Sequence, residues 1–394
     1  PQLRFEGFTD DWEERKLGDV GNTFTGLTGK TKEDFGHGSA KFVTYVNVFK
    51  NPIATLDQLD AIEIDEKQNQ VQKGDIFFTT SSETPEEVGM SSVWTHDTEN
   101  VYLNSFTFGY RPRVSFDLNY MASMLRSPSI RKKITFLAQG ISRYNISKTK
   151  MLEIEIPTPT LSEQEKIGSF FKQLDNTIAL HQRKLDLLKE QKKGYLQKMF
   201  PKNGAKVPEL RFAGFADDWE ERKLDELVEQ IIREVPKPNK PYYRMSVRSH
   251  AKGTFRQFVD NPDNVAMDKL FIVKKDDLVV NITFAWEHAI AVVKEENDGL
   301  LVSHRFPTYR ADGKSDIKFL NYVVSKEDFR RKLEFISPGG AGRNRVLNKK
   351  DFLKLKIFVP KIEEQQKIGS FFKQLDDTIA LHQRKLDLLK EQKK

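Results

Sequence analysis

The sequence contains no cysteine among its 394 residues. This absence excludes disulfides, thiolate zinc sites, iron–sulfur clusters and a cysteine nucleophile, and it is typical of a reducing compartment. No apolar run approaches the roughly 18 residues that a membrane-spanning helix needs, and no secretory leader opens the chain. We therefore expect an intracellular protein without a membrane partner.

Acidic residues are fewer than basic ones, with 57 Asp and Glu against 64 Lys and Arg, and the formal net charge is +7. So small an excess matters only where it is concentrated. Residues 118–152 and 235–259 contain no acid, and residues 330–350 contain only Glu334. Such runs can neutralise phosphates, although any one of them taken alone is more typical of a solvated face. Three clusters in corresponding parts of the chain favour nucleic-acid binding.

Catalytic motifs are also missing. The string GLTGKT at 26–31 resembles the end of a phosphate loop, but Phe24 stands where that motif requires glycine. There is no dinucleotide or S-adenosylmethionine glycine fingerprint and no Asn-Pro-Pro-aromatic tetrapeptide. The histidines never fall at metal-ligand spacing, and Glu287-His288 has no partner group nearby in the sequence. We expect neither catalytic residues nor a metal site in this chain.

What the chain does contain is a repeat. PQLRFEGFTDDWEERKL at 1–17 recurs at 208–224 with three changes, and the string at 163–193 recurs at 364–394 with two. Between these marks, residues 18–157 and 225–360 share only a faint outline. A duplication followed by ordinary drift should blur both kinds of segment alike. The contrast instead favours two modules that recognise different things on one shared frame.

The repeated strings predict two long helices, each with an apolar seam at alternating spacings of four and three residues. The seam residues are Ile167, Phe171, Leu174, Ile178, His181, Leu185 and Leu188 in the first helix, and Ile368, Phe372, Leu375, Ile379, His382, Leu386 and Leu389 in the second. Two identical seams on one chain are expected to bury each other in an antiparallel, pseudo-twofold coiled coil. The alternative is that each helix packs on its own domain.

A second apolar row lies off the seam and would be wet in a two-helix coil. We predict that it binds another protein. Its members are Phe170, Leu180, Leu187, Leu381 and Leu388.

Candidate DNA readers are polar residues in turns beside basic or aromatic ones, because Arg can pair with guanine and Asn or Gln with adenine in the major groove. In the first variable segment they are Lys30, Lys32, Tyr45, Asn47, Ser81, Ser82, Arg143, Tyr144 and Asn145. In the second they are Tyr242, Tyr243, Arg244, Arg248, Asn281, Trp286, Arg343, Asn344 and Arg345.

Two divergent segments, each opened by WEERKL and followed by a copy of EQxKIGSFFKQLDxTIALHQRKL, resemble the specificity subunit of type I restriction–modification systems. The resemblance covers the whole chain. It implies an α+β fold with two tandem α/β target recognition domains, at 1–159 and 208–360, separated by two long helices. Those helices, at 160–200 and 361–394, form an antiparallel coiled coil, and residues 201–207 link the halves. The first helix continues through GYLQKMF whereas the second stops at Lys394, and the sequence begins at Pro1, so we expect a longer native chain.

The resemblance also implies function. Each domain would read one half of a split, asymmetric site in double-stranded DNA, and the helices would set the gap and dock two methyltransferase subunits. Restriction subunits would attach through those methyltransferases. S-adenosylmethionine, ATP and Mg would belong to the partners, this chain would hold no cofactor, and the complex would act at the nucleoid in the bacterial cytoplasm. Two other classes stay open, a self-contained nuclease or methyltransferase and a coiled-coil assembly protein that binds no nucleic acid.

Overall fold

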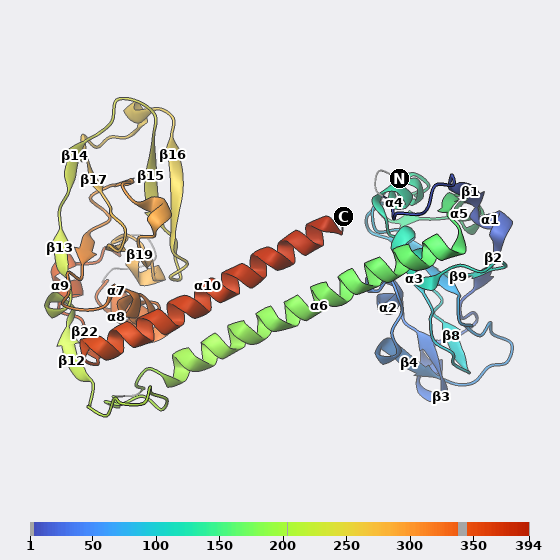
Figure 1. Cartoon of the computed structure of the whole chain (residues 1–394), viewed down its shortest axis with the longest axis horizontal. Helices are drawn as coiled ribbons and strands as arrows, with labels where there is room; N and C mark the ends of the chain where they lie inside the picture. The colour runs from blue at the N-terminus through green and yellow to red at the C-terminus, as the bar shows by residue number, and fades with distance from the viewer. Residues whose placement is uncertain (1–3, 203, 338–344, 394) are drawn as a thin grey trace. The chain divides into compact units, whose positions relative to one another are not determined.

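The computed structural model describes residues 4–202, 204–337 and 345–393. The chain divides into two compact units. Unit 1 consists of Pro1–Gln182 with Lys385–Lys394, and unit 2 of Arg183–Arg384. Each unit therefore holds one of the two divergent segments together with parts of both long helices (Figure 1). No helix among the described residues combines the length and apolar character that crossing a membrane would require.

Unit 1 is built on a four-stranded sheet of order β2-β9-β5-β7 and a three-stranded sheet of order β4-β3-β8. The strands are β2 (Gly21–Thr25), β3 (Phe35–Val43), β4 (Leu59–Ile62), β5 (Ile76–Thr79), β7 (Ser91–Val93), β8 (Val101–Leu103) and β9 (Thr107–Pro112). Two short pairs complete the unit, β1 (Glu13–Lys16) with β11 (Glu155–Thr158), and β6 (Ser81–Ser82) with β10 (Tyr144–Asn145). The continuous apolar run of β5 is buried on both faces, as expected for a central strand.

Short helices cover these sheets. They are α1 (Leu17–Val20), η1 (Lys32–Asp34), α2 (Tyr45–Lys50), η2 (Leu56–Gln58), α3 (Leu118–Met124), α4 (Pro128–Phe136) and α5 (Lys148–Leu152). The main core of unit 1 forms where α3 and α4 pack on the four-stranded sheet, through residues such as Ile76, Phe108, Met121 and Ile134.

Unit 2 repeats this plan and adds to it. Its four-stranded sheet has the order β13-β21-β18-β19, and its second sheet has five strands in the order β14-β17-β20-β15-β16. The strands are β13 (Glu229–Ile231), β14 (Glu234–Pro236), β15 (Tyr242–Val247), β16 (Thr254–Val259), β17 (Lys269–Ile272), β18 (Leu278–Val280), β19 (Ile290–Val292), β20 (Leu301–Val302) and β21 (Thr308–Arg310), with the pair β12 (Glu220–Lys223) and β22 (Lys356–Val359).

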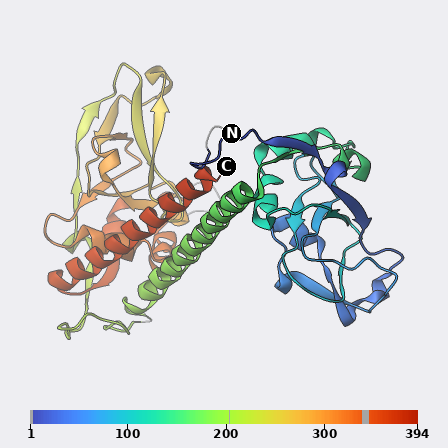
Figure 2. The same cartoon turned by 45° about the vertical axis from the view of Figure 1, so that its right-hand side comes forward.

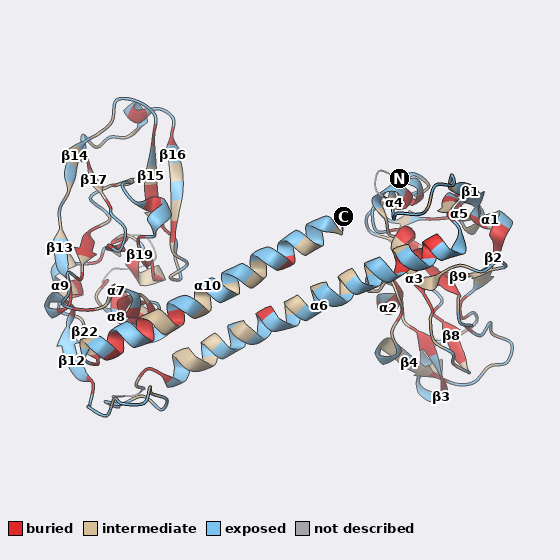
Figure 3. Cartoon of the chain, viewed as in Figure 1, coloured by how far each residue is buried: buried red, intermediate tan, exposed pale blue. Residues whose placement is uncertain are grey.

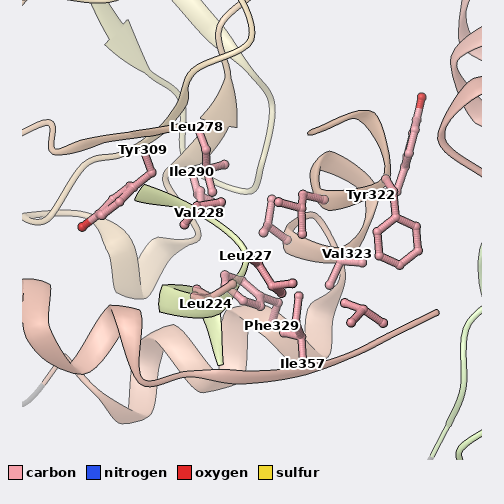
Figure 4. Close-up of a cluster of buried hydrophobic side chains, with 14 of the residues drawn as sticks. Leu224, Leu227, Val228, Leu278, Ile290, Tyr309, Tyr322, Val323, Phe329 and Ile357 are labelled. Atoms are coloured by element: carbon pink, nitrogen blue, oxygen red, sulfur yellow. The ribbon is translucent and has the colours of Figure 1, made fainter. Parts of the chain in front are cut away.

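The helices of unit 2 follow those of unit 1 only in part, since the described chain has no helix between β15 and β16 as α2 lies between β3 and β4. They are η3 (Leu224–Glu226), η4 (Pro262–Asn264), η5 (Ala285–Glu287), η6 (Glu295–Asn297), α7 (Ile317–Val324), α8 (Glu327–Phe335) and α9 (Lys349–Leu353). Leu224, Leu278, Ile290, Tyr309 and Phe329 lie in one core cluster beneath them (Figure 4).

The faint sequence outline shared by the two halves corresponds to a shared topology. The four-stranded sheets match strand for strand, and in both units a parallel pair, β3 with β8 and β15 with β20, continues into an antiparallel hairpin. In each unit a buried aspartate directly before a central strand pairs with an arginine on the neighbouring strand. Asp75 pairs with Arg111 at 2.7 Å, and Asp277 pairs with Arg310 at 2.9 Å. The divergent segments are therefore two versions of one domain.

The two predicted long helices are α6 (Leu161–Lys198) and α10 (Ile362–Gln392), and every seam residue is buried or half-buried. Inside unit 2 the C-terminal half of α6 lies against the N-terminal half of α10, running the opposite way (Figure 1, Figure 2). There Lys192 pairs with Asp376 at 2.5 Å, and Lys189 donates to Gln383. Inside unit 1 the end of α10 lies against α6 in the same register, with Lys390 donating to Gln182. The antiparallel coiled coil is thus confirmed.

Each long helix is fixed to its own domain by a repeated joint. In unit 1 Arg4 donates two hydrogen bonds, of 2.7 and 2.8 Å, to the carboxylate of Glu163, whose side chain is 1% exposed. In unit 2 Arg211 binds Glu364 in the same way. The next residues, Gln164 and Gln365, accept hydrogen bonds from the backbone at the N-terminal ends of α3 and α7. The residues that attach each long helix to its domain are therefore the same in both repeats.

Candidate nucleic-acid interface

A frame of backbone hydrogen bonds gathers many of the predicted readers of unit 1. Thr80, directly after β5, donates to the carbonyl of Phe106 at 3.1 Å and accepts from the amide of Ile146 at 3.0 Å. Three segments far apart in the sequence therefore meet at the end of β5. Each presents its neighbouring side chains at the same place.

The side chains around this frame contact one another. The Tyr45 hydroxyl donates to the carbonyl of Ser81 at 3.0 Å, and Arg143 donates to the Ser81 hydroxyl at 3.3 and 3.2 Å. Strand β10 pairs with β6, so that Tyr144 lies opposite Ser82 and Asn145 opposite Ser81. Six predicted residues are thus brought together: Tyr45, Ser81, Ser82, Arg143, Tyr144 and Asn145. The Arg143 and Asn145 side chains are exposed.

Unit 2 contains the same frame with different side chains. Ile282, after β18, donates to the carbonyl of Arg305 at 3.0 Å, and Leu347 donates to the carbonyl of Ile282 at 2.9 Å. By these bonds Arg305 occupies the place of Phe106. The backbone pattern is kept while an aromatic side chain is exchanged for a cation.

A groove runs beside this frame in unit 2, between β15 and the segments that follow β18 and β20. Its lining includes Arg244, Gln257, Thr283 and Arg305. Arg244 donates to the Gln257 amide oxygen at 2.9 Å, and Arg305 donates to the Thr283 hydroxyl at 3.4 Å. The groove therefore offers guanidinium, amide and hydroxyl groups, which are the side-chain types that read base edges.

Two residues before Leu347 of the frame, the guanidinium of Arg345 lies 5.4 Å from the centre of the Trp286 ring and pairs with Glu334 at 3.5 Å. The predicted readers Arg343 and Asn344 lie outside the described residues. Tyr242 lines the groove and is 9% exposed. Asn281 is 6% exposed, and its side-chain oxygen accepts a hydrogen bond from the Thr283 amide. For these last two the predicted reading role is limited by burial.

Other predicted readers are placed elsewhere. Asn47 is fully buried and holds the carbonyls of Thr55 and Gln58, so its prediction as a DNA reader is wrong. Lys30 pairs with Asp65 at 2.8 Å, and that hydrogen bond is the main cause that lowers the Asp65 pKa to about 2. Lys32 is exposed on η1.

Two further predicted readers of unit 2, one on β15 and one directly after it, do not line the groove. Tyr243 is exposed, and its ring packs 5.0 Å from that of Phe258, on the opposite face of the strand from Arg244. Arg248 follows the end of β15 and lies over the Phe255 ring.

The basic clusters are also less free than their sequence indicates. Arg126 donates to the carbonyls of Ser91 and Val48, and burial lowers its pKa to about 10. Arg131 donates to the carbonyls of Gly89 and Val88. Both half-buried arginines brace unit 1 internally, so they are less available to phosphate than the sequence indicates.

Several exposed residues near the frames escaped the sequence analysis. Phe106 is 60% exposed at the frame of unit 1, and the similarity of LNSFTFGYR at 103–111 to LVSHRFPTYR at 301–310 could have paired it with Arg305. Phe136 and Phe335, the last residues of α4 and α8, are each 88% exposed. The matching strings IRKKITF and FRRKLEF could have revealed this pair, because both end a basic helix with phenylalanine.

The off-seam row of the long helices is exposed. Leu180, Leu187, Leu381 and Leu388 are between 54% and 66% exposed. Phe170 is 50% exposed and its ring contacts Phe5 at 6.0 Å. No group of three or more His, Asp or Glu side chains within the described ranges could hold a metal ion.

Comparisons with known proteins agree with this duplicated plan. The family model of the type I restriction modification DNA specificity domain matches residues 9–190 and 216–391. The chain is 23% identical to a protein described as the MjaX specificity subunit of Methanocaldococcus jannaschii, over 98% of this chain and 91% of that protein. It is 21% identical to the StySPI specificity subunit of Salmonella potsdam, over 93% and 82%.

Solved structures show the same fold. The S subunit from M. genitalium aligns with a TM-score of 0.57 at 14% identity, covering 100% of this chain and 96% of that one. The HsdS subunit from Thermoanaerobacter tengcongensis aligns with a TM-score of 0.50 at 16% identity, covering 98% and 96%. Since two copies of the family's domain together span most of its length, the chain belongs to the specificity subunits of type I restriction–modification systems.

Proposed function

We propose that each unit reads one half of a split DNA site and that the chain itself carries out no chemistry. The observation that supports this most directly is the shared backbone frame. The hydrogen bonds made by Thr80 and Ile282 are the same, whereas the side chains they position differ, as Phe106 and Arg305 do. A frame that holds its main chain fixed while its exposed side chains change is suited to reading different sequences.

The long helices in this proposal set the gap between the half-sites and dock two methyltransferase subunits. The exposed leucines support the docking role, because apolar side chains repeated along a helix are stabilised when another surface covers them. The partners would supply S-adenosylmethionine, ATP and Mg, and restriction subunits would join through the methyltransferases. The docking role is supported by the exposed leucines, and the roles of the partners are those that membership of the family implies.

The test is a domain exchange in the assembled complex. Residues 18–157 are replaced by those of a relative, and methylated adenines are mapped in a strain that carries the partner subunits. We expect one half-site to change while the other half-site and the gap persist. The matched exchange of residues 225–360 should alter the opposite half-site. If either exchange altered both halves, the units would not be independent readers.

A further inference from the structure

A tight hairpin, residues 139–145, lies beside the backbone frame of unit 1. Gln139 and Asn145 close it with two backbone hydrogen bonds of 2.9 Å, one in each direction. Asn145 also lies opposite Ser81 in the pairing of β10 with β6, and Arg143 donates to the Ser81 hydroxyl. The base of the hairpin is therefore fixed to the frame.

The tip of this hairpin presents an apolar side chain to solvent. Gly140 has a φ of 147°, and a Cβ added there would lie 2.0 Å from the Arg143 carbonyl oxygen, so the turn requires glycine. The next residue, Ile141, is 96% exposed. All residues of the hairpin except Tyr144 are exposed, and the hairpin follows α4 (Figure 3). A constrained turn thus holds Ile141 away from the core of unit 1.

A second exposed apolar side chain, Phe106, belongs to the frame itself. Its carbonyl accepts hydrogen bonds from both the amide and the hydroxyl of Thr80, at 3.1 and 2.8 Å. In unit 2 the same backbone position is occupied by Arg305, whose carbonyl accepts from Ile282. The frame therefore forms equally well around a cation, and the fold does not require an apolar residue there. The exposed ring of Phe106 is a property of what unit 1 binds.

The major groove of DNA limits what such side chains can contact. Guanine, cytosine and adenine present hydrogen-bond donors and acceptors there, whereas thymine adds an apolar C5 methyl group. An apolar side chain placed against a donor or acceptor would remove water from it without replacing the hydrogen bond, which is unfavourable. Phe106 and Ile141 are therefore complementary to a thymine methyl group.

We propose that unit 1 recognises thymine in its half-site through the C5 methyl group, and that Phe106 and Ile141 are the side chains that contact it. This inference rests on the proposed function and names a base that unit 1 reads. It assigns a role in specificity to two residues at the frame of unit 1, one of them on the hairpin that also carries the exposed Arg143 and Asn145.

Deoxyuridine tests the proposal because it differs from thymidine only by lacking this methyl group. The half-site of unit 1 is assigned by the domain exchange described above, and each of its thymines is replaced singly by deoxyuridine. Competition binding then compares these DNAs on the assembled complex. We expect at least one replacement to weaken binding by about fourfold, the loss expected for one buried methyl group.

The double variant Phe106→Ala, Ile141→Ala should bind the thymine and deoxyuridine DNAs equally. Both residues are exposed, so the melting temperature of the variant should stay close to that of the unchanged chain. Phe136→Ala is the matched control. Phe136 is 88% exposed and close by in the sequence, but its counterpart Phe335 is equally exposed in unit 2, so it does not distinguish the two units. The control should keep the fourfold difference.

A deoxyuridine effect that persisted in the double variant would overturn the proposal. If that variant also bound the methyltransferase subunits more weakly, the two side chains would belong to a protein interface instead. The proposal also fails if no thymine of this half-site responds while the complex still prefers its own site. A complex without any sequence preference would refute the proposed function, and this inference with it.

Discussion

At the residue scale, the same main-chain positions carry different chemistry in the two units. Phe106 and Arg305 share a backbone hydrogen-bonding role, yet one offers an apolar ring and the other five N–H donors. Arg305 is exposed, and among the described residues its side chain makes a single hydrogen bond, of 3.4 Å, to Thr283. It is therefore available to a base edge, unlike Arg310, which is held by buried Asp277.

Replacing Arg305 by Ala should weaken binding of the correct site by about 1–3 kcal/mol and relax specificity at one position of one half-site. The loss is local because a base contact, unlike a phosphate contact, depends on sequence. Competition binding of the assembled complex with single-base variants of the site measures it. Lys350→Ala, an exposed cation on α9, is the control for a phosphate-type effect. Uniform weakening across all variants by Arg305→Ala would contradict the reading role.

Glu163 makes the joint of unit 1 sensitive to acid. Hydrogen bonds from Arg4 lower the Glu163 pKa, with a smaller contribution from the Trp12 indole. A folded-state pKa below the unfolded value stabilises the fold at neutral pH, and this stabilisation is lost as the pH falls through the folded value. Glu163→Gln should lower the melting temperature at pH 7 and have progressively less effect toward pH 3. Glu165→Gln, two residues further along α6 and exposed, is the control and should leave the melting temperature nearly unchanged.

At the scale of elements, a glycine sets how closely α6 approaches α3. A Cβ added at Gly168 would lie 2.1 Å from the Asp117 carboxylate and 2.7 Å from the Tyr120 amide. These two groups form the N-cap hydrogen bond of α3, in which the Tyr120 amide donates to the Asp117 carboxylate. The joint therefore requires glycine in the middle of a helix, where glycine costs about 1 kcal/mol relative to alanine.

Gly168→Ala should consequently destabilise unit 1 by about 1–3 kcal/mol, because overpacking outweighs the gain in helix propensity. Gly194 in the same helix has nothing within 4 Å of an added Cβ. Gly194→Ala should instead stabilise the chain by up to about 1 kcal/mol. Denaturant unfolding of both variants measures the two effects, and equal signs for the two substitutions would contradict the close approach of α3.

The exposed leucines give a second prediction for the helices. Changing Leu180, Leu187, Leu381 and Leu388 to Gln should leave the isolated subunit helical and its melting temperature nearly unchanged, since all four are more than half exposed. Binding of the methyltransferase subunits should weaken, because each leucine contributes roughly 1.5–3 kcal/mol if a partner covers it fully. Circular dichroism melting and a pull-down check this together. Lost stability with intact partner binding would refute it.

Elements with local periodicity could be predicted from the sequence, and features that depend on distant partners could not. The heptad spacing predicted that α6 and α10 are long helices and that they pair, because apolar residues at alternating spacings of four and three lie on one face of a helix. Asn47 and Arg126 look like surface polar residues in the sequence. Asn47 is buried and Arg126 is half-buried, because carbonyls contributed by other segments accept their hydrogen bonds. Nothing within a few residues of either position signals that environment.

At the scale of the whole molecule, the question is what the paired helices do for recognition. Both are longer than a domain needs for its own core, and both keep the same register of polar contacts in the two units. Their repeated joints, Arg4 with Glu163 and Arg211 with Glu364, attach each domain firmly to the start of its helix. A change in helix length should therefore be transmitted to the domains rather than absorbed in a flexible link.

Inserting one heptad into both helices keeps the seam in register and lengthens the path between the domains by about 10.5 Å, at 1.5 Å per residue. This corresponds to about three base pairs at 3.4 Å each. We expect the mapped methylation site to keep both half-sites and to gain about three base pairs of gap. An insertion into α6 alone should break the seam and lower the melting temperature, since only one of the two partners moves. If the double insertion left the chain stable and the gap unchanged, the helices would hold the domains together without setting their spacing on DNA.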